Sequence, residues 1–172
     1  MSARVAVAAL SLARGARAFV LASLRPERAL RRHALGQCRL ANAELGWLGE
    51  RCAARELRAR GVVVVAQRLA TKLAELDLVA RDGRELVVIE VKTGRLGARF
   101  RPGDRFDVER ARRLADAAGR LAVRLPVVAW RVELFEVGLH DDGSIEFTRT
   151  VSAREEVRAW PAPRSTQASL RT

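Results

Sequence analysis

Two acidic residues and a lysine interrupt the most apolar segments of the chain. Asp77 lies in the segment 76–80, and Glu90 and Lys92 end the segment 86–92. Side chains alternate between the two faces of a β-strand, so Glu90 and Lys92 would project from the same face. Carboxylates bind Mg²⁺ or Mn²⁺, which neutralise phosphate charge and activate water, and an adjacent lysine can orient that water. The pattern therefore predicts metal-assisted hydrolysis of a phosphodiester bond.

A surface ion pair is the main alternative for Glu90 and Lys92. Two such residues on one strand face most often form a solvent-exposed pair that contributes little to stability. Here they follow the apolar run 86–89, where an unpaired charge is costly, and Asp77 lies in an equally apolar segment. Charged groups that converge from buried strands favour a functional site. Glu75 could join this cluster or mark the start of its strand, and we favour the second interpretation.

The dipeptide Asp82-Gly83 between two apolar runs predicts a β-hairpin. If these two residues form the turn, Asp77 lies opposite Val88 and diagonally across from Glu90. Diagonal neighbours on one face are about 7–8 Å apart, a spacing that one divalent ion can bridge. A shift of one residue would instead send Asp77 to the opposite face.

The surrounding segments predict an α/β domain with a mixed central sheet flanked by helices, in the order α-β-β-β-α-β-β. The first helix would present Glu50 on its buried side, although Glu56 shares that side. The expected segments are a helix over 42–60, strands over 62–65, 73–80 and 85–92, a helix over 108–124, and strands over 127–137 and 144–150.

The chain has a formal charge of +12, and it is unevenly distributed. Residues 1–41 hold eight arginines against the single acid Glu27. This segment could be a disordered basic arm, an extension from an upstream start codon or an organelle transit peptide, and we favour the first two. We therefore expect a disordered N-terminal extension over 1–41, a nuclease-like domain over 42–157 and a disordered tail over 158–172.

The composition also narrows the partners and the compartment. Arginines cut the apolar N-terminal stretches well below the roughly 20 residues of a membrane span. Cys38 and Cys52 fit reduced thiols of a cytoplasmic protein, and His33 and His140 lie too far apart to suggest a zinc site. The basic charge favours nucleic acid as the partner, DNA more than RNA, although a general abundance of arginine weakens that inference. The sequence leaves a homodimer possible.

The motifs from about residue 42 to 150 resemble those of the uncharacterised bacterial YraN-like family (UPF0102). That family shows Gly-Glu in its first helix, a GEIDLIA-like strand and an FVEVKTR-like strand. This chain has Gly49-Glu50, Ala74-Glu75-Leu76-Asp77-Leu78-Val79-Ala80 and Val88-Ile89-Glu90-Val91-Lys92-Thr93-Gly94, with looser matches at Arg110-Ala111-Arg112-Arg113-Leu114 and Arg131-Val132-Glu133.

The family is similar to restriction-endonuclease-like proteins and archaeal Holliday-junction resolvases, which share a PD-(D/E)xK site. The resemblance implies that Asp77, Glu90 and Lys92 are the strand residues of such a site and that Glu50 is its helix carboxylate. Mg²⁺ or Mn²⁺ would be the cofactor, held by Asp77, Glu90 and Glu50. The chain departs from the family at Ala74 and Gly94, which replace a glycine and an arginine.

Arginines around the second predicted helix are the candidate nucleic-acid contacts. A solvated face in an arginine-rich chain is the alternative interpretation. The function could accordingly be a metal-dependent nuclease, a nucleic-acid-binding module with little catalysis, or an interaction subunit whose charges form a structural network. The candidate contacts are Arg99, Arg101, Arg105, Arg110, Arg113 and Arg120.

Overall fold

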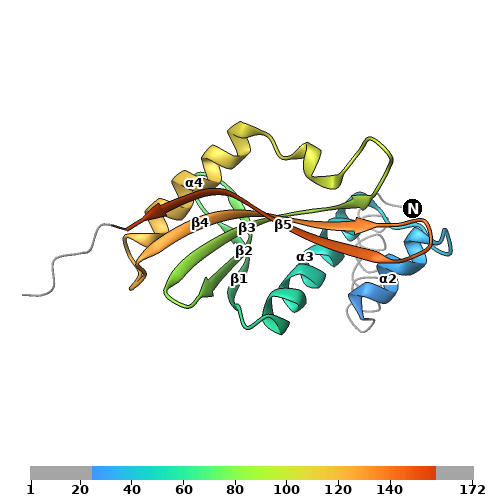
Figure 1. Cartoon of the computed structure of the whole chain (residues 1–172), viewed down its shortest axis with the longest axis horizontal. Helices are drawn as coiled ribbons and strands as arrows, with labels where there is room; N and C mark the ends of the chain where they lie inside the picture. Colours follow the sequence, from blue (N-terminus) through green and yellow to red (C-terminus); the bar gives the residue numbers. More distant parts are fainter. Residues whose placement is uncertain (1–24, 158–172) are drawn as a thin grey trace, which may run out of the picture.

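A computed structural model describes residues 25–157 of the chain, and in it one sheet lies between helices (Figure 1). From α3 onward the elements follow the predicted order, which confirms the α/β class. The predicted tail over 158–172 lies outside the described residues. The elements are α2 (Pro26–Ala34), α3 (Asn42–Ala59), β1 (Val63–Ala70), β2 (Glu75–Asp82), β3 (Glu85–Arg95), the 3-10 helix η1 (Pro102–Arg105), α4 (Val108–Ala122), β4 (Ala129–Leu139) and β5 (Ile145–Glu156).

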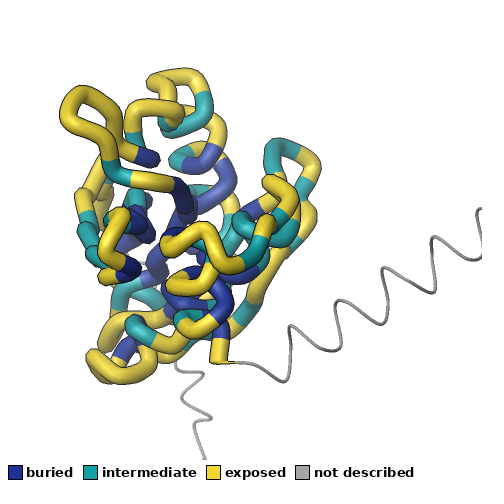
Figure 2. The backbone as a smooth tube through the Cα atoms, turned by 90° about the vertical axis from the view of Figure 1, so that its right-hand side faces the viewer, coloured by how far each residue is buried: buried dark blue, intermediate teal, exposed yellow. Residues whose placement is uncertain are grey.

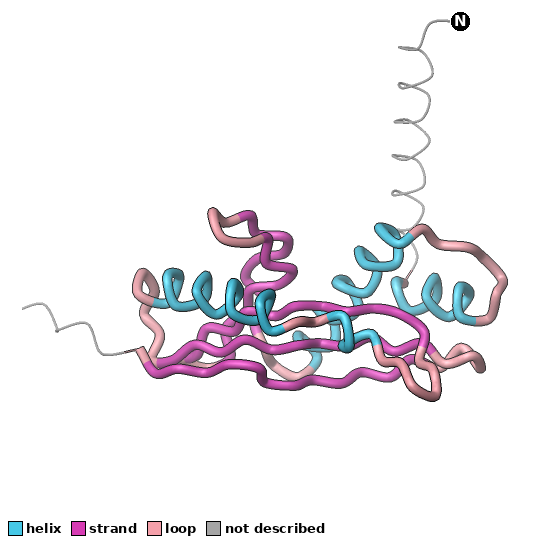
Figure 3. Tube along the Cα trace, turned by 90° about the horizontal axis from the view of Figure 1, so that it is seen from above, coloured by secondary structure: helices cyan, strands magenta, loops and turns pink. Residues whose placement is uncertain are grey.

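The five strands form one mixed sheet in sequential order, β1-β2-β3-β4-β5. Strand β3 pairs in parallel with β4, and the other three pairs are antiparallel. Parallel neighbours require a crossover connection, and here η1 and α4 provide it. Seen from above, η1 and α4 follow one another along the length of the long strands (Figure 3).

Helices α3 and α4 lie on opposite faces of the sheet, so the sheet is apolar on both sides (Figure 1). On β3, Ile89 packs in the cluster with Leu57 of α3, and Val88 packs in the cluster with Leu114 of α4. Figure 2 shows the buried stretches of the backbone gathered in the interior of the molecule, with exposed stretches around them. A strand covered on both faces is apolar along its whole length, which explains the uninterrupted run before Glu90. None of the helices within residues 25–157 is long and apolar enough to cross a membrane.

The β2–β3 hairpin forms as predicted, but its register differs from the predicted one. Asp82 pairs with Glu85 and Leu78 pairs with Ile89, so the turn consists of Gly83 and the residue after it. Gly83 has φ +57°, the conformation that a tight hairpin turn requires at its first central position. The change moves each of the paired residues 78–82 two positions along β3 and preserves the face on which its side chain lies.

Strand β2 changes faces at Asp77. Leu78 packs in the α3-side cluster, whereas Leu76 packs in the α4-side cluster, although residues two apart normally share a face. On β1 the pairs on either side of this point leave Arg68 across from Asp77, and Arg68 has φ +52°. A positive φ is unusual for a residue other than glycine and marks a local distortion of the strand. Asp77 therefore lies at a distortion of β2, between a residue that faces α4 and a residue that faces α3.

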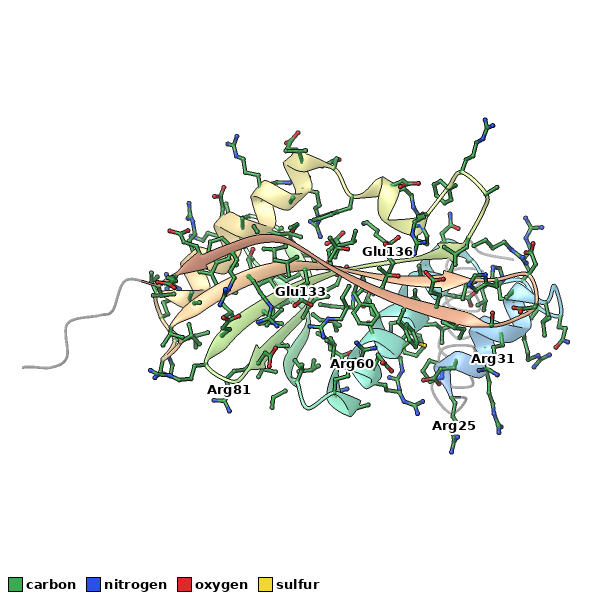
Figure 4. The ribbon with its side chains drawn as sticks, viewed as in Figure 1. Arg25, Arg31, Arg60, Arg81, Glu133 and Glu136 are labelled. Carbon is green, nitrogen blue, oxygen red and sulfur yellow. The ribbon has the colours of Figure 1, made fainter. Side chains whose placement is uncertain are left out.

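Part of the predicted N-terminal extension belongs to the folded domain, which corrects the boundary at residue 42. Helix α2 buries Ala29, Leu30 and Ala34 in the cluster that it shares with α3. Its arginines lie on the outer side, and Arg25 and Arg31 point away from the body (Figure 4). The arginine-rich composition concealed this amphipathic pattern. Residues 1–24 lie outside the described part of the chain.

We expect Leu30→Ala to lower the free energy of unfolding by about 2–5 kcal/mol, the usual loss for a fully buried leucine. Leu30 has no exposed surface, so its removal leaves a cavity between α2 and α3. Urea denaturation measures the change. The control is Arg31→Ala on the exposed face of α2, which should alter stability by less than about 0.5 kcal/mol. Equal stability of Leu30→Ala and the unmodified protein would show that α2 is not part of the folded domain.

Candidate functional site

Asp77 is held between β2 and β3 at the level of Glu90. The backbone N–H of Val91 donates to Asp77 Oδ2 at 2.8 Å, just beyond the last regular pair of the two strands. Burial, followed by the negative charge of Glu90, raises the pKa of Asp77 to about 6, against the lowering effects of Val91 N–H, Arg110 and Lys92. The carboxyl group is thus short of positive charge in spite of its hydrogen bond.

Glu50 reaches the same region from α3 because the helix approaches the sheet closely at the preceding residue. A Cβ atom on Gly49 would lie 1.7 Å from Thr93 Oγ1 on β3, so only glycine fits there. Burial and then the charge of Asp77 raise the pKa of Glu50 to about 7, while Arg68 opposes the shift. Glu50 and Asp77 therefore lie close enough for their charges to repel each other.

Glu56 shares the inner side of α3 with Glu50 in the sequence pattern, but the structure separates the two. Glu56 pairs at 2.8 Å with Arg60, which caps the C-terminal end of the same helix. Glu75 begins β2, is exposed, and pairs with Arg68 at 3.1 Å. The charges of Glu56 and Glu75 are thus each balanced by an arginine outside the cluster.

Glu90 and Lys92 share a face of β3, as predicted, and contact each other directly. Lys92 Nζ donates to Glu90 Oε1 at 2.6 Å. Arg110 of α4 adds a second cation, with Nη2 at 2.8 Å and Nε at 3.1 Å from Glu90 Oε2. Glu90 is only 2% exposed, so this pairing neutralises a buried charge.

The structure therefore brings all four predicted site residues together, but their charges are balanced to different degrees. Glu90 is neutralised by Lys92 and Arg110, whereas Glu50 and Asp77 form no ion pair within residues 25–157. In that same part of the chain, no three Asp, Glu, His or Cys side chains converge in an arrangement able to hold a metal ion. Binding a divalent cation to Glu50, Asp77 and Glu90 together would require Glu90 to give up part of its present pairing.

The six candidate nucleic-acid arginines do not form one free surface. Arg110 is half-buried on Glu90, which differs from the solvent-facing position that we expected. Arg101 pairs with Glu146 at 2.7 Å, and Arg105 donates to the carbonyl of Thr93 at 2.9 Å. Arg110 alone of the set is partly buried, and the exposed members are Arg99, Arg101, Arg105, Arg113 and Arg120.

Sequence reasoning missed two residues at the edge of this site. Arg68 lies across from Asp77 and acts on the charge of Glu50. Thr93 Oγ1 is buried and finds no hydrogen-bond partner within residues 25–157. Thr93 packs against Gly49, which lies 44 positions away in the chain, so no local sequence pattern predicts this contact.

A second charged cluster links four strands away from this site. Glu133 is buried and is held by Arg131 at 2.7 Å and by Arg149 at 2.7 Å. Figure 4 shows Glu133 near the middle of the sheet, whereas Glu136 lies toward η1, where it accepts from Gly103 N. Arg131 also pairs with Asp82 and Glu85, and Arg154 pairs with Glu85. Every member has an opposite charge beside it, so the cluster serves to hold the strands together.

The family model described as "Uncharacterised protein family UPF0102" matches residues 49–137, just over half of the chain. The chain belongs to this family. A UPF0102 protein of Beutenbergia cavernae is 44% identical over 99 residues, which cover 52% of this chain and 83% of the relative. A UPF0102 protein of Porphyromonas gingivalis is 36% identical over 103 residues, covering 58% and 74%. One of Thermotoga petrophila is 38% identical over 69 residues, covering 40% and 62%.

The matched region of the UPF0102 chain begins at Gly49 and includes all four site residues. It also contains Arg110 and the Arg131–Glu133 pair. It ends within β4, so α2 and β5 lie outside it. The names of these relatives state no activity.

Proposed function

We propose that this UPF0102 protein is a divalent-metal-dependent nuclease that hydrolyses phosphodiester bonds in nucleic acid, DNA more than RNA. The observation that carries the proposal is the pair Glu50 and Asp77, whose charges repel each other beside Glu90 and Lys92. Perturbed acids beside a lysine on a buried sheet are typical of catalytic sites. We further propose that the fold is of the restriction-endonuclease-like type, on the arrangement of a helix acid, a strand Asp and a Glu-x-Lys strand.

The donor set fits a hard divalent cation. Glu50 and Asp77 offer carboxylate oxygens that lack a cationic partner within residues 25–157, and carboxylates are the ligands that Mg²⁺ and Mn²⁺ prefer. In this proposal Asp77, Glu90 and Glu50 hold the cation, which supplies charge neutralisation on the phosphate and an activated water.

We assign to Lys92 a direct role in the reaction, in contact with the phosphate or the attacking water. Its side chain is 24% exposed while its ammonium contacts Glu90, so it lies at the border between the buried strand and solvent. From there it can offset charge on the phosphate or orient the attacking water. In this proposal the phosphate backbone is held by Arg99, Arg101, Arg105, Arg110, Arg113 and Arg120.

A second candidate function follows from the pairing of Glu90. Lys92 and Arg110 already neutralise it without any cation, as expected of a structural network. A nucleic-acid-binding module with little catalysis, or a non-catalytic interaction subunit, would retain this network.

We propose a cytoplasmic location because Cys38 and Cys52 are both free thiols. A homodimer is compatible with each of these functions.

Cleavage of a substrate panel tests the proposal. Branched, nicked and linear DNA and structured RNA are incubated with the protein and Mg²⁺, Mn²⁺ or chelator. We expect metal-dependent cleavage of at least one DNA, and none by Asp77→Asn. Tight binding without cleavage would favour the binding module, and neither binding nor cleavage would favour the interaction subunit.

A further inference from the structure

Both carboxylate oxygens of Glu90 are held by cationic side chains. Lys92 contacts Oε1, and Arg110 contacts Oε2 through two nitrogens. A further cation approaching Glu90 would be repelled by both positive charges, and this repulsion is strong where water is largely excluded. In this arrangement Glu90 is closed to a divalent cation.

Arg110 is held in this position by contacts with three elements. Asp107 caps α4 by accepting a hydrogen bond from Arg110 N at 2.6 Å, which fixes the backbone of the first turn. Arg110 Nη2 also donates to the carbonyl of Glu75 at 2.8 Å, so the guanidinium joins α4 to the start of β2 and to Glu90 on β3. The side chain of Arg110 is nevertheless 22% exposed, so it is reachable from solvent.

Of the two cations on Glu90, Arg110 is the one suited to leave. Lys92 lies two residues from Glu90 on the same strand face and remains near it whatever else binds. Arg110 comes from a different element, and its fork of donors matches the oxygens of a phosphate as well as those of a carboxylate. A backbone phosphate at the mouth of the site would therefore compete with Glu90 for Arg110.

We propose that Arg110 is a latch on the site. It holds Glu90 while no nucleic acid is bound, and it exchanges Glu90 for a backbone phosphate when nucleic acid binds, which frees Glu90 to take a divalent cation. This inference rests on the proposed function. Because the exchange couples the two ligands, nucleic acid raises the affinity for the cation and the cation raises the affinity for nucleic acid by the same factor.

Titration calorimetry with Mn²⁺ alone tests the latch without any measurement of activity. We expect Arg110→Gln to bind Mn²⁺ on the order of tenfold more tightly than the unmodified protein, the scale of one charge-assisted hydrogen bond. The matched control is Arg112→Gln on the same helix. Arg112 is exposed and forms no ion pair within residues 25–157, so its removal should leave Mn²⁺ affinity unchanged.

A second titration adds a duplex DNA with phosphorothioate linkages. The duplex should raise the Mn²⁺ affinity of the unmodified protein and leave that of Arg110→Gln unchanged. If Arg110→Gln does not fold, Arg110→Lys keeps the charge, loses the two-nitrogen contact and should give a smaller gain in the same direction. Equal Mn²⁺ binding by the variant and the unmodified protein would overturn the latch and leave the proposed function standing. Failure of both proteins to bind Mn²⁺ would overturn the latch and the metal-dependent function together.

Discussion

Lys92→Met is expected to lower the single-turnover rate of nucleic-acid cleavage by roughly 10²–10⁴, the scale for removing one acid, base or electrostatic group from an active site. The expected loss follows from the position of Lys92 beside Glu90 at the border of the buried strand. Nucleic-acid binding should change little, and Mn²⁺ should bind no more weakly, because in the proposed site the carboxylates hold the cation and Lys92→Met removes one repelling charge from Glu90.

The second cation on Glu90 reduces the expected effect of Lys92→Met on the free energy of unfolding. A buried carboxylate that loses its sole partner costs about 3–5 kcal/mol, but Glu90 would still be paired with Arg110. We therefore expect a smaller loss in the free energy of unfolding. The control is Lys72→Met, which replaces the other lysine of the chain at an exposed position.

Cleavage and thermal unfolding are to be measured on one preparation of each protein, with Mg²⁺ and with chelator. Undiminished cleavage by Lys92→Met would remove Lys92 from the reaction. A large loss of stability that Mg²⁺ does not restore, together with inactive unmodified protein on every substrate, would favour the structural network.

Local sequence signals predicted the hairpin and the shared face of Glu90 and Lys92. Asp82-Gly83 lies between apolar runs, and β3 is apolar because helices cover both of its faces. These features depend on residues near one another in the chain, where turn chemistry and strand alternation act directly. The register of the hairpin depended on which residue takes the positive φ, and Gly83 rather than Asp82 begins the turn.

The geometry of Asp77 was beyond such signals. An uninterrupted strand would alternate faces along all of β2, but β2 changes faces between Leu76 and Leu78. The distortion involves Arg68 on the neighbouring strand, and its left-handed backbone is set by pairing and packing rather than by its own preference. The contact between Arg110 and Glu90 was missed for a related reason, since a helical arginine is equally compatible with solvent and with a buried carboxylate.

Asp77→Asn should make the metal-free protein more stable at pH 8 while removing its capacity for metal. Burial and the charge of Glu90 raise the pKa of Asp77 from 3.8 to about 6 in the folded protein. Between these values the folded state binds more protons than the unfolded state, so the carboxyl group lowers the free energy of unfolding as pH rises from about 4 to 6. Above that window the full penalty is present, about 1–2 kcal/mol after allowance for solvent screening.

Asparagine has no charge to desolvate, and its carbonyl oxygen can still accept from Val91 N–H. The gain in stability should therefore be seen at pH 8 and be mostly lost near pH 4, where the aspartate is protonated in the folded state and partly protonated in the unfolded state. Glu50→Gln should behave in the same direction because the pKa of Glu50 is also raised, to about 7. Asp116→Asn, at an exposed position of α4, is the matched control and should change stability by less than about 0.5 kcal/mol at either pH.

Urea denaturation at pH 8 and pH 4 measures the stabilisation, and Mn²⁺ calorimetry measures the accompanying loss. Removal of a residue that only supports a ligand already weakens metal binding 10–100-fold, so loss of Asp77 itself should weaken it by at least about that factor. Opposite signs for the two measurements would distinguish a group kept for chemistry from one kept for packing. If Asp77→Asn instead destabilises the protein at pH 8 and binds Mn²⁺ as the unmodified protein does, Asp77 is a structural acceptor for Val91, and the cluster loses the acid on which the proposed metal site depends.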